Sequence, residues 1–393
     1  MSVLSILVLG LTLAVLLVSA LLVWSLWTRR VFDWLPAYLS GLRNRPRPGN
    51  GPVHVMFCFV DHYEPRWGNC DYETERKRVR RWCEDYPRLC EGHRDADGRP
   101  PRHSFFFPEE EYRPEHMKDL VELCSRGYGE IEVHLHHDND TEAGLREKLR
   151  GFTRLLADEY GALPVMPDGR VAWAFVHGNW ALDNSRPDGR WCGVNNELIV
   201  LREEGCYADF TLPSAPDATQ TRTINSIYYA TDDPHCPKSH DHGEPVRVGG
   251  QPSGDLMIIQ GPLGLNWRWR KFGVVPRIEN ADVRRTSPPR MDRTDLWVRT
   301  GIHVAGRPEW VFVKVHTHGT QEGDVDTLLG PPTAAMFTHL ESRYNDGERY
   351  KLHYVTAREM YNIIKAAEAG CAGDPDLYRD HVIPAPTFRA AQK

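Results

Sequence analysis

The first thirty residues contain a stretch that is too long and too apolar for an ordinary surface element. Residues 3–27 carry no charged side chain and are dominated by Leu, Val and Ile. A helix of this length crosses the roughly 30 Å hydrocarbon core of a bilayer. A cleaved signal peptide is the alternative, but no Lys or Arg precedes the stretch, and apolar residues continue beyond the cleavage-like Val18-Ser19-Ala20. We therefore expect one uncleaved transmembrane anchor over residues 1–30.

Charges on the two sides of this stretch predict how the anchor is oriented. Several arginines follow it closely, whereas only the amino group of the chain precedes it. Because cytoplasmic flanks of membrane helices are enriched in Lys and Arg, we expect a single-pass protein of the cell membrane with its large domain in the cytoplasm. The periplasmic or extracellular side is the alternative. The arginines are Arg29, Arg30, Arg43, Arg45 and Arg47.

Beyond the anchor, the pattern predicts a linker, one large domain and a tail. Residues 31–52 are expected to be a juxtamembrane linker, which ends in the Pro/Gly/Arg-rich sequence NRPRPGNGP. Over residues 53–372, short apolar runs alternate with amphipathic segments, which indicates an α/β domain built on a parallel sheet. A barrel and an open doubly wound sheet both fit this alternation. Irregular insertions are expected at 213–254 and 266–301, and a loose tail at 373–393.

Hydrophobic periodicity and end signals give the expected elements. A capping box, Thr356 with Glu359, marks the start of the last helix. Strands are expected at 53–60, 103–107, 130–134, 171–176, 207–212, 255–260, 309–315 and 351–355. Helices are expected at 73–91, 114–126, 141–160, 195–204, 331–344 and 356–369.

Composition excludes several classes of function. The net charge is −6 and no basic stripe is present, which argues against nucleic acid as a partner. No GxGxxG follows the first strand, so the usual dinucleotide site is absent from the sequence. The nine cysteines contain no CxxC pair, and we expect them to be buried free thiols. The chain has 18 His, and His is the commonest metal ligand and acid–base group.

Ionisable side chains gather where the predicted strands end. In a parallel barrel the carboxyl ends of all strands face one mouth, where active sites are built. We therefore expect four His-bearing strand ends to converge on one pocket. Residues 109–111, three consecutive Glu, are interpreted as a solvated charge run. The four strand ends read Asp61-His62-Tyr63-Glu64, His134-Leu135-His136-His137-Asp138, His177-Gly178-Asn179-Trp180 and His316-Thr317-His318.

The sequence around residue 134 predicts a metal site. His134 and His136 are two residues apart, so a continuing strand would direct both imidazoles to one face. Two imidazoles and a carboxylate from another strand form a triad with open positions, and Asp61 is the expected carboxylate. Asp138 is the alternative to His136. Nitrogen and carboxylate ligands favour Zn²⁺, although other divalent metals remain possible.

The order of these motifs resembles that of the NodB-type polysaccharide deacetylases, carbohydrate esterase family four. The resemblance extends over about residues 51–370. Where the first family motif has a strand ending in Phe-Asp-Asp-Gly, this chain has Phe59-Val60-Asp61-His62, so that Val60 replaces the family's usual base. The two-His motif resembles His134 with His136 or Asp138, the third region resembles 175–180, and the last resembles 315–318.

This resemblance implies a distorted (β/α)7 barrel that removes N-acetyl or O-acetyl groups from a polysaccharide or glycan precursor with the help of a divalent metal. Its expected partners are the glycan and a polysaccharide biosynthesis machinery. Glu64 or Asp183 would replace the missing base, and His316 or His318 would protonate the leaving group. The expected substrate-binding residues are His177, Asn179 and Trp180. The alternatives are a catalytically altered glycan-binding relative, and another metal-dependent amidohydrolase or phosphohydrolase on the same fold.

Overall fold

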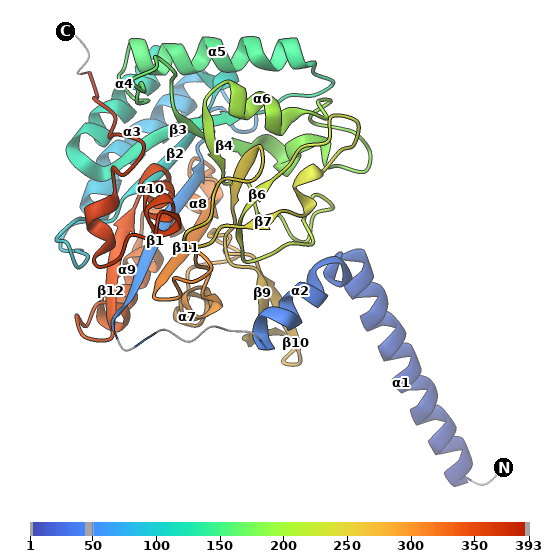
Figure 1. Cartoon of the computed structure of the whole chain (residues 1–393). Helices are drawn as coiled ribbons and strands as arrows, with labels where there is room; N and C mark the ends of the chain where they lie inside the picture. Colours follow the sequence, from blue (N-terminus) through green and yellow to red (C-terminus); the bar gives the residue numbers. More distant parts are fainter. Residues whose placement is uncertain (1–2, 44–48, 50, 390–393) are drawn as a thin grey trace.

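A mostly parallel β-sheet forms the centre of the computed structural model, which describes residues 3–43, 49 and 51–389 (Figure 1). The strand order is β11-β1-β2-β3-β4-β5-β8-β6-β7, and β12 pairs with the first half of β1. Strands β6 and β7 are antiparallel additions beyond β8. The parallel strands are β1 (Val53–His62), β2 (His103–Pro108), β3 (Gly129–Leu135), β4 (Trp173–His177), β5 (Cys206–Asp209), β8 (Leu256–Ile259), β11 (Trp310–Thr317) and β12 (Tyr350–Val355). All eight expected strands are among them, which confirms a mixed α/β domain on a mostly parallel sheet.

Alternate residues of each strand enter two different cores. In β1, Val55, Phe57 and Phe59 pack against helices α3 to α9, on what we name the outer face. Met56 and Val60 belong to the second core, which contains α10, on what we name the α10 face. Because both faces are covered, β1 is apolar on both faces from Val55 to Val60, as is typical of parallel sheets. This two-residue alternation decides where each polar side chain at a strand end points.

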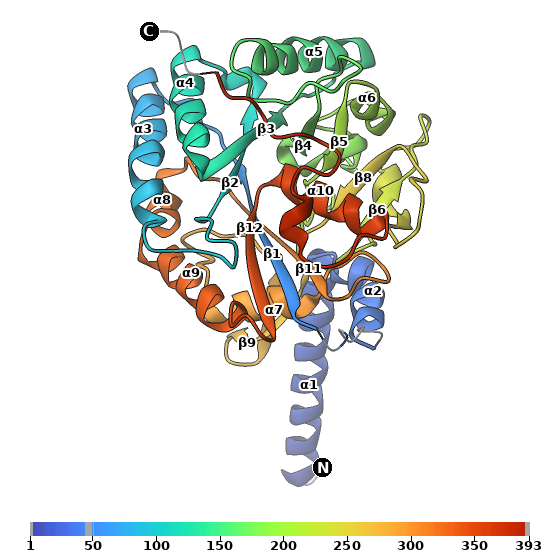
Figure 2. The same ribbon diagram turned by 60° about the vertical axis from the view of Figure 1, so that its left-hand side comes forward.

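The helices cover the sheet from several sides (Figure 2). In that view α3, α4, α5 and α9 lie at the periphery, whereas α10 lies across the middle. The expected capping box of α10 is formed, because the Thr356 hydroxyl accepts from the Glu359 backbone N–H and the Glu359 carboxylate from that of Thr356. The helices are α3 (Tyr72–Leu89), α4 (Pro114–Leu123), α5 (Glu142–Asp158), α6 (Glu197–Glu203), α7 (Met291–Thr300), α8 (Glu322–Leu328), α9 (Pro331–Tyr344) and α10 (Ala357–Glu368).

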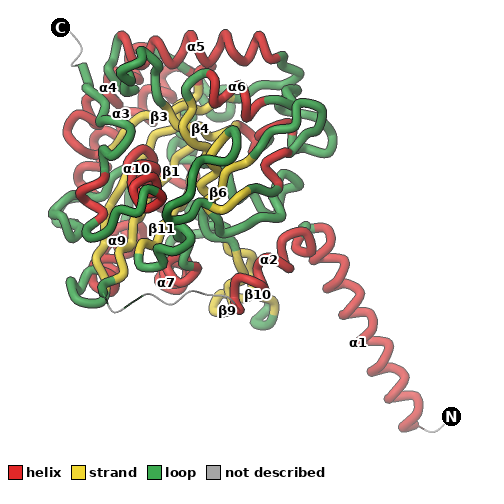
Figure 3. The backbone as a smooth tube through the Cα atoms, viewed as in Figure 1, coloured by secondary structure: helices red, strands yellow, loops and turns green. Residues whose placement is uncertain are grey.

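The N-terminal part of the chain forms two helices. Helix α1 (Val3–Thr28) projects from the body and is long and apolar enough to span a membrane (Figure 3). Helix α2 (Val31–Arg43) occupies most of the segment expected to be a linker. Its Val31 and Trp34 are buried against Ala215 and Leu263, so an apolar stripe at helical spacing stabilises it. The rest of the expected linker, 44–48 and 50, lies outside the described residues.

Two other segments are more regular than expected. Residues 264–300 contain the hairpin of β9 (Gly264–Lys271) and β10 (Val275–Glu279), followed by α7. Its many Arg residues obscure the strand pattern, yet Arg293 is buried and pairs with Glu279 at 2.7 Å. The expected loose tail is packed as far as residue 389, because the buried Arg379 forms an ion pair with Glu359. The insertion at 213–254 is mostly loop and contains β6 (Ile227–Ala230) and β7 (Glu244–Pro245).

Candidate metal centre

Three strand ends bring histidines together on the α10 face of the sheet. Parallel pairing places Val60 beside His316 and the end of β3 beside the end of β4, so these strands finish at one edge. The His62 ring lies 5.0 Å from that of His134 and 4.6 Å from that of His318, between ring centroids. The convergence expected from the sequence is therefore present for β1, β3 and β11.

A carboxylate and two imidazoles form a group of potential metal ligands at this edge. Glu64 Oε1 lies 3.2 Å from His134 Nε2 and 3.5 Å from His136 Nε2. Two ligands bound about 2.1 Å from a tetrahedral ion are about 3.4 Å apart, so the observed spacing fits one ion. His62 and His318 form a second group that shares Glu64. Four imidazoles thus lie around the Glu64 carboxylate.

The outer ring nitrogens of both imidazoles are already engaged. His134 Nδ1 donates to the Val176 carbonyl at 2.7 Å, and His136 Nδ1 donates to Glu110 Oε1 at 2.5 Å. Because these partners only accept, the hydrogen of each neutral ring is on Nδ1 and the lone pair of Nε2 points toward Glu64. Metal-bound histidines are oriented in this way by carbonyl and carboxylate partners. The described side chains are therefore arranged so that a cation satisfies them.

Burial controls the charge of this group. It raises the pKa of Glu64, lowers that of His134 to about 3 and places that of His62 well below its usual range. Burial also acts to lower the pKa of His136, but the hydrogen bond and charge of Glu110 outweigh it and leave that pKa raised. Neutral His134 and His62 are the forms that bind metal, since a protonated imidazole has no lone pair to offer.

Unpaired polar atoms and a cleft lie beside the ligands. Glu64 Oε2, His62 Nε2, His316 Nδ1 and Trp180 Nε1 are buried without a hydrogen-bond partner among the described residues. Such atoms are rare in folded proteins and indicate a missing ligand or a functional site. A cleft of about 280 Å³ is lined by Trp180, His316 and His318, together with Asn280, Asp282, Arg284 and the loop at 213–217.

The structure places Asp61 away from the ligands expected to accompany it. Asp61 lies two residues after Phe59 in β1, so its side chain is on the same face of the sheet as that of Phe59, the outer face. Its Oδ2 is 2.9 Å from His103 Nε2, and its Oδ1 accepts from the Gly319 backbone N–H at 2.6 Å. Glu64 replaces it as the carboxylate beside His134. Asp61 instead fixes the backbone that follows β11.

Three other expected site residues also lie outside the histidine group. Asp138 is exposed and accepts from the backbone N–H groups of Asn139 and Trp191. Asp183 is buried, accepts from the Ser239 N–H at 2.6 Å, and has its pKa raised by burial to about 8. His177 has outer-face parity and forms a separate buried group with His137, Cys192 and Glu197. Asn179 adopts a left-handed backbone with φ 54°.

Sequence reasoning missed Glu110, which the charge-run interpretation treated as solvated. Its carboxylate accepts from both the ring and the backbone N–H of His136. Burial acts to raise the pKa of Glu110, but the His136 contacts lower it overall, so the carboxylate stays ionised. The available signal was position: Glu110 follows the end of β2 at the same edge as the other site residues.

Comparison with known proteins adds no family to this description, because no protein-family model matches the sequence and no curated protein matches it. The geometry of the side chains is therefore the basis for assigning chemistry to the site.

Proposed function

We propose that the chain is a metal-dependent hydrolase that removes N-acetyl or O-acetyl groups from a glycan. One observation carries the proposal: Glu64, His134 and His136 direct a carboxylate oxygen and two imidazole nitrogens to one point. His318, whose ligand atom lies within 4.8 Å of that of Glu64, lines the neighbouring cleft. Three protein ligands leave at least one coordination position of the metal open for water or substrate, as catalytic sites require.

We also propose that the domain is a distorted (β/α)7 barrel, the fold of the deacetylases that the sequence resembles. The strands follow one another around the sheet from β11 to β8 almost in sequence order. Lys314 of β11 donates to the carbonyls of Phe210 and Leu212, which follow β5, at 2.5 and 2.6 Å. This contact across the α10 face supports a curled sheet whose two ends approach each other.

A divalent ion, with Zn²⁺ as our choice, lowers the pKa of a bound water and polarises a carbonyl oxygen. Glu64, His134 and His136 would hold it, and Glu110 orients His136. His318 is half-buried at the cleft and is the side chain best placed to take or give a proton at the leaving nitrogen or oxygen. His316 lies deeper, and burial depresses its pKa strongly, so it is a hydrogen-bond acceptor for substrate.

The cleft suits a neutral, ring-shaped substrate. Trp180 offers an apolar ring face and an unpaired indole N–H, which together match a sugar ring and one of its oxygens. Arg284 is the cationic group of the cleft, but its Nε lies 2.5 Å from Asp282 Oδ2. This ion pair offsets its charge and favours a glycan over a phosphorylated substrate.

The test is acetate release from a soluble chitooligosaccharide by the full-length, Zn²⁺-loaded protein in detergent. Glu64→Gln and His134→Ala should each abolish release, whereas the exposed Asp138→Asn should leave it unchanged. Release that survives Glu64→Gln would refute the proposed site. Stable metal binding with no acetate release would favour a glycan-binding role, and release of phosphate from a phosphate ester would favour a phosphohydrolase.

We further propose that α1 anchors the protein in the cell membrane, where it acts with polysaccharide biosynthesis machinery, and that the arginines after α1 place the domain in the cytoplasm. Exposed apolar side chains beside the anchor support this arrangement. Phe32 and Leu39 of α2, and Trp267 and Phe272 of the β9–β10 hairpin, are exposed. Helix α2 lies beside this hairpin (Figure 1). Protease digestion of intact and opened cells tests the orientation, because only opened cells should lose the domain.

A further inference from the structure

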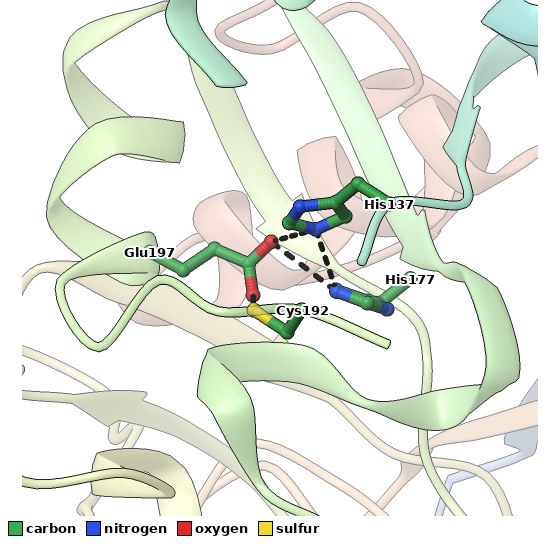
Figure 4. A group of neighbouring side chains, drawn as sticks. All are labelled: His137, His177, Cys192 and Glu197. Carbon is green, nitrogen blue, oxygen red and sulfur yellow. Dashed lines mark hydrogen bonds and ion pairs between the residues drawn. The ribbon is translucent and has the colours of Figure 1, made fainter. Parts of the chain in front are cut away.

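We propose that His137, His177, Cys192 and Glu197 hold a second metal ion, Zn²⁺, in a closed site that is structural rather than catalytic. This inference is independent of the proposed hydrolase activity. The four side chains come from three segments: His137 follows β3, His177 ends β4, and Cys192 and Glu197 lie in the loop before α6 and at the first residue of α6 (Figure 4).

The ligand atoms are as close together as one bound ion requires. His137 Nε2 lies 2.9 Å from His177 Nε2 and 3.1 Å from Glu197 Oε1. His177 Nε2 is 3.4 Å from the same Glu197 oxygen, and Cys192 Sγ is 3.5 Å from Glu197 Oε2. One atom from each of the four residues falls within 4.8 Å of all the others. Ligands of a tetrahedral zinc ion, at about 2.1 to 2.3 Å from it, are spaced about 3.4 to 3.8 Å apart.

Hydrogen bonding orients one of the two rings. His177 Nδ1 donates to the Gly178 carbonyl at 2.6 Å, so the hydrogen of the neutral ring is on Nδ1 and its Nε2 presents a lone pair to His137 and Glu197. His137 Nδ1 is buried without a hydrogen-bond partner among the described residues, 3.2 Å from Asp140 Oδ2, and His137 Nε2 is the nitrogen that faces His177 and Glu197. A cation between these atoms would take the lone pairs of both Nε2 nitrogens and place the His137 hydrogen on Nδ1, toward Asp140.

The ligand set and its burial point to a structural ion. All four residues are buried, and three of them, His177, Cys192 and Glu197, have no exposed surface. Four protein ligands complete a tetrahedral zinc shell and leave no position for substrate. A thiolate and a carboxylate also neutralise the two charges of the ion, which reduces the cost of burial. The Glu64 group, by contrast, contains no cysteine, and Glu64 lies beside His318, which lines a cleft.

The proposed ion would hold the segments that carry the candidate active site. His137 directly follows His136, and His177 precedes Gly178, whose backbone packs on the His136 ring. A Cβ at residue 178 would lie 2.4 Å from His136 Cδ2, so the two segments are in close contact. Trp180 follows in the same turn. An ion bound by His137 and His177 would therefore hold His136, which precedes His137, and Trp180, which lies in the turn after His177.

The test uses Co²⁺ in place of the native ion in the full-length protein. A cysteine ligand gives a thiolate-to-cobalt charge-transfer absorption in the near ultraviolet, which the Glu64 group cannot give. We expect two metal equivalents and this absorption in the wild type, and one equivalent with the absorption intact in Glu64→Gln. Cys192→Ser should lose the absorption and one equivalent, whereas the exposed control Cys236→Ser should keep both.

A wild type without the absorption, or a Cys192→Ser protein that retains it, would overturn the proposal. If Cys192→Ser does not fold, zinc-edge X-ray absorption of the wild type decides the question. A sulfur neighbour at about 2.3 Å is expected from the zinc, and a coordination sphere of nitrogen and oxygen alone would refute the site. The absorption and its loss in Cys192→Ser do not depend on the hydrolase proposal, which concerns a site without sulfur; failure of that proposal would change only the number of equivalents in the wild type.

Discussion

Replacing Asp61 with Asn should separate stability from metal binding. Asp61 and His103 are buried with side-chain exposures of 0% and 2%, and Asp61 also accepts from Gly319 N–H. Asn keeps the shape and one acceptor but presents an NH₂ or a neutral oxygen to His103. Losing a buried hydrogen bond to a charged group costs up to about 3 kcal/mol. A domain of about 340 residues has an unfolding entropy of about 0.7 kcal/mol/K, so the expected loss in Tm is up to about 4 °C.

The assay is calorimetric unfolding of Asp61→Asn and Glu64→Gln, each in the metal-free and Zn²⁺-loaded forms. Asp61→Asn should lower Tm in both forms and keep the Zn²⁺-dependent increase. Glu64→Gln should leave the metal-free Tm unchanged or raised, because burial without a partner for Oε2 disfavours the ionised carboxylate. It should lose the part of the Zn²⁺-dependent increase that comes from this site and keep the part that comes from the group around Cys192. The reasoning would be refuted if Asp61→Asn lost the Zn²⁺-dependent increase while its metal-free Tm matched the wild type.

Three further variants test the surroundings of the site. Glu110→Gln removes the carboxylate that orients His136 and should weaken Zn²⁺ binding by about tenfold or more in competition with a chelator; unchanged affinity would show that Glu110 has no such role. Gly178→Ala should lower Zn²⁺ affinity and activity with the fold intact by circular dichroism, since its Cβ would clash with the His136 ring; full activity would contradict the close packing. Burial lowers the pKa of Lys314 from 10.5 to about 7 in the folded protein. Between pH 7 and 10.5 the unfolded chain therefore binds more protons than the folded protein, so the free energy of unfolding of the wild type should rise with pH in this range. Lys314→Met should lack this contribution when the free energy of unfolding is measured by urea denaturation at several pH values. The same pH dependence in the variant and the wild type would mean that Lys314 stays charged in the folded protein.

The sheet was predictable because its strands are short apolar runs with clear ends. The helix over 331–344 has the bounds expected from the sequence, and the capping box at Thr356 is formed. Helix α2 was missed because its segment runs from the anchor to the Pro/Gly/Arg-rich sequence and was assigned to the linker; its burial against Ala215 and Leu263 depends on tertiary packing. The β9–β10 hairpin was missed because Arg side chains interrupt its alternation, and in the structure Arg277 stacks on Trp269 at 4.1 Å. Tertiary contacts of this kind cannot be read from periodicity.

The site was predictable in part. The alternation of side chains along a strand explains why His134 was predicted correctly and Asp61 was not. His134 alternates with Val133 and Leu135 along β3. Because those two residues pack on the outer face, the His134 side chain points to the α10 face, where the His62 ring also lies. The same rule applied to β1 places Asp61 with Phe59 on the outer face. Glu64 lies beyond the end of β1, where the alternation stops, and only the path of the loop brings it to His134. Loop paths of this kind depend on packing that a single sequence does not specify.

Metal binding by Glu64, His134 and His136 is tested most directly by an anomalous difference map from a crystal of the full-length protein, measured at the zinc absorption edge. We expect a peak about 2.1 Å from Glu64 Oε1, His134 Nε2 and His136 Nε2. A metal bound at Asp61, or no peak among these three side chains in crystals grown with Zn²⁺, would contradict it.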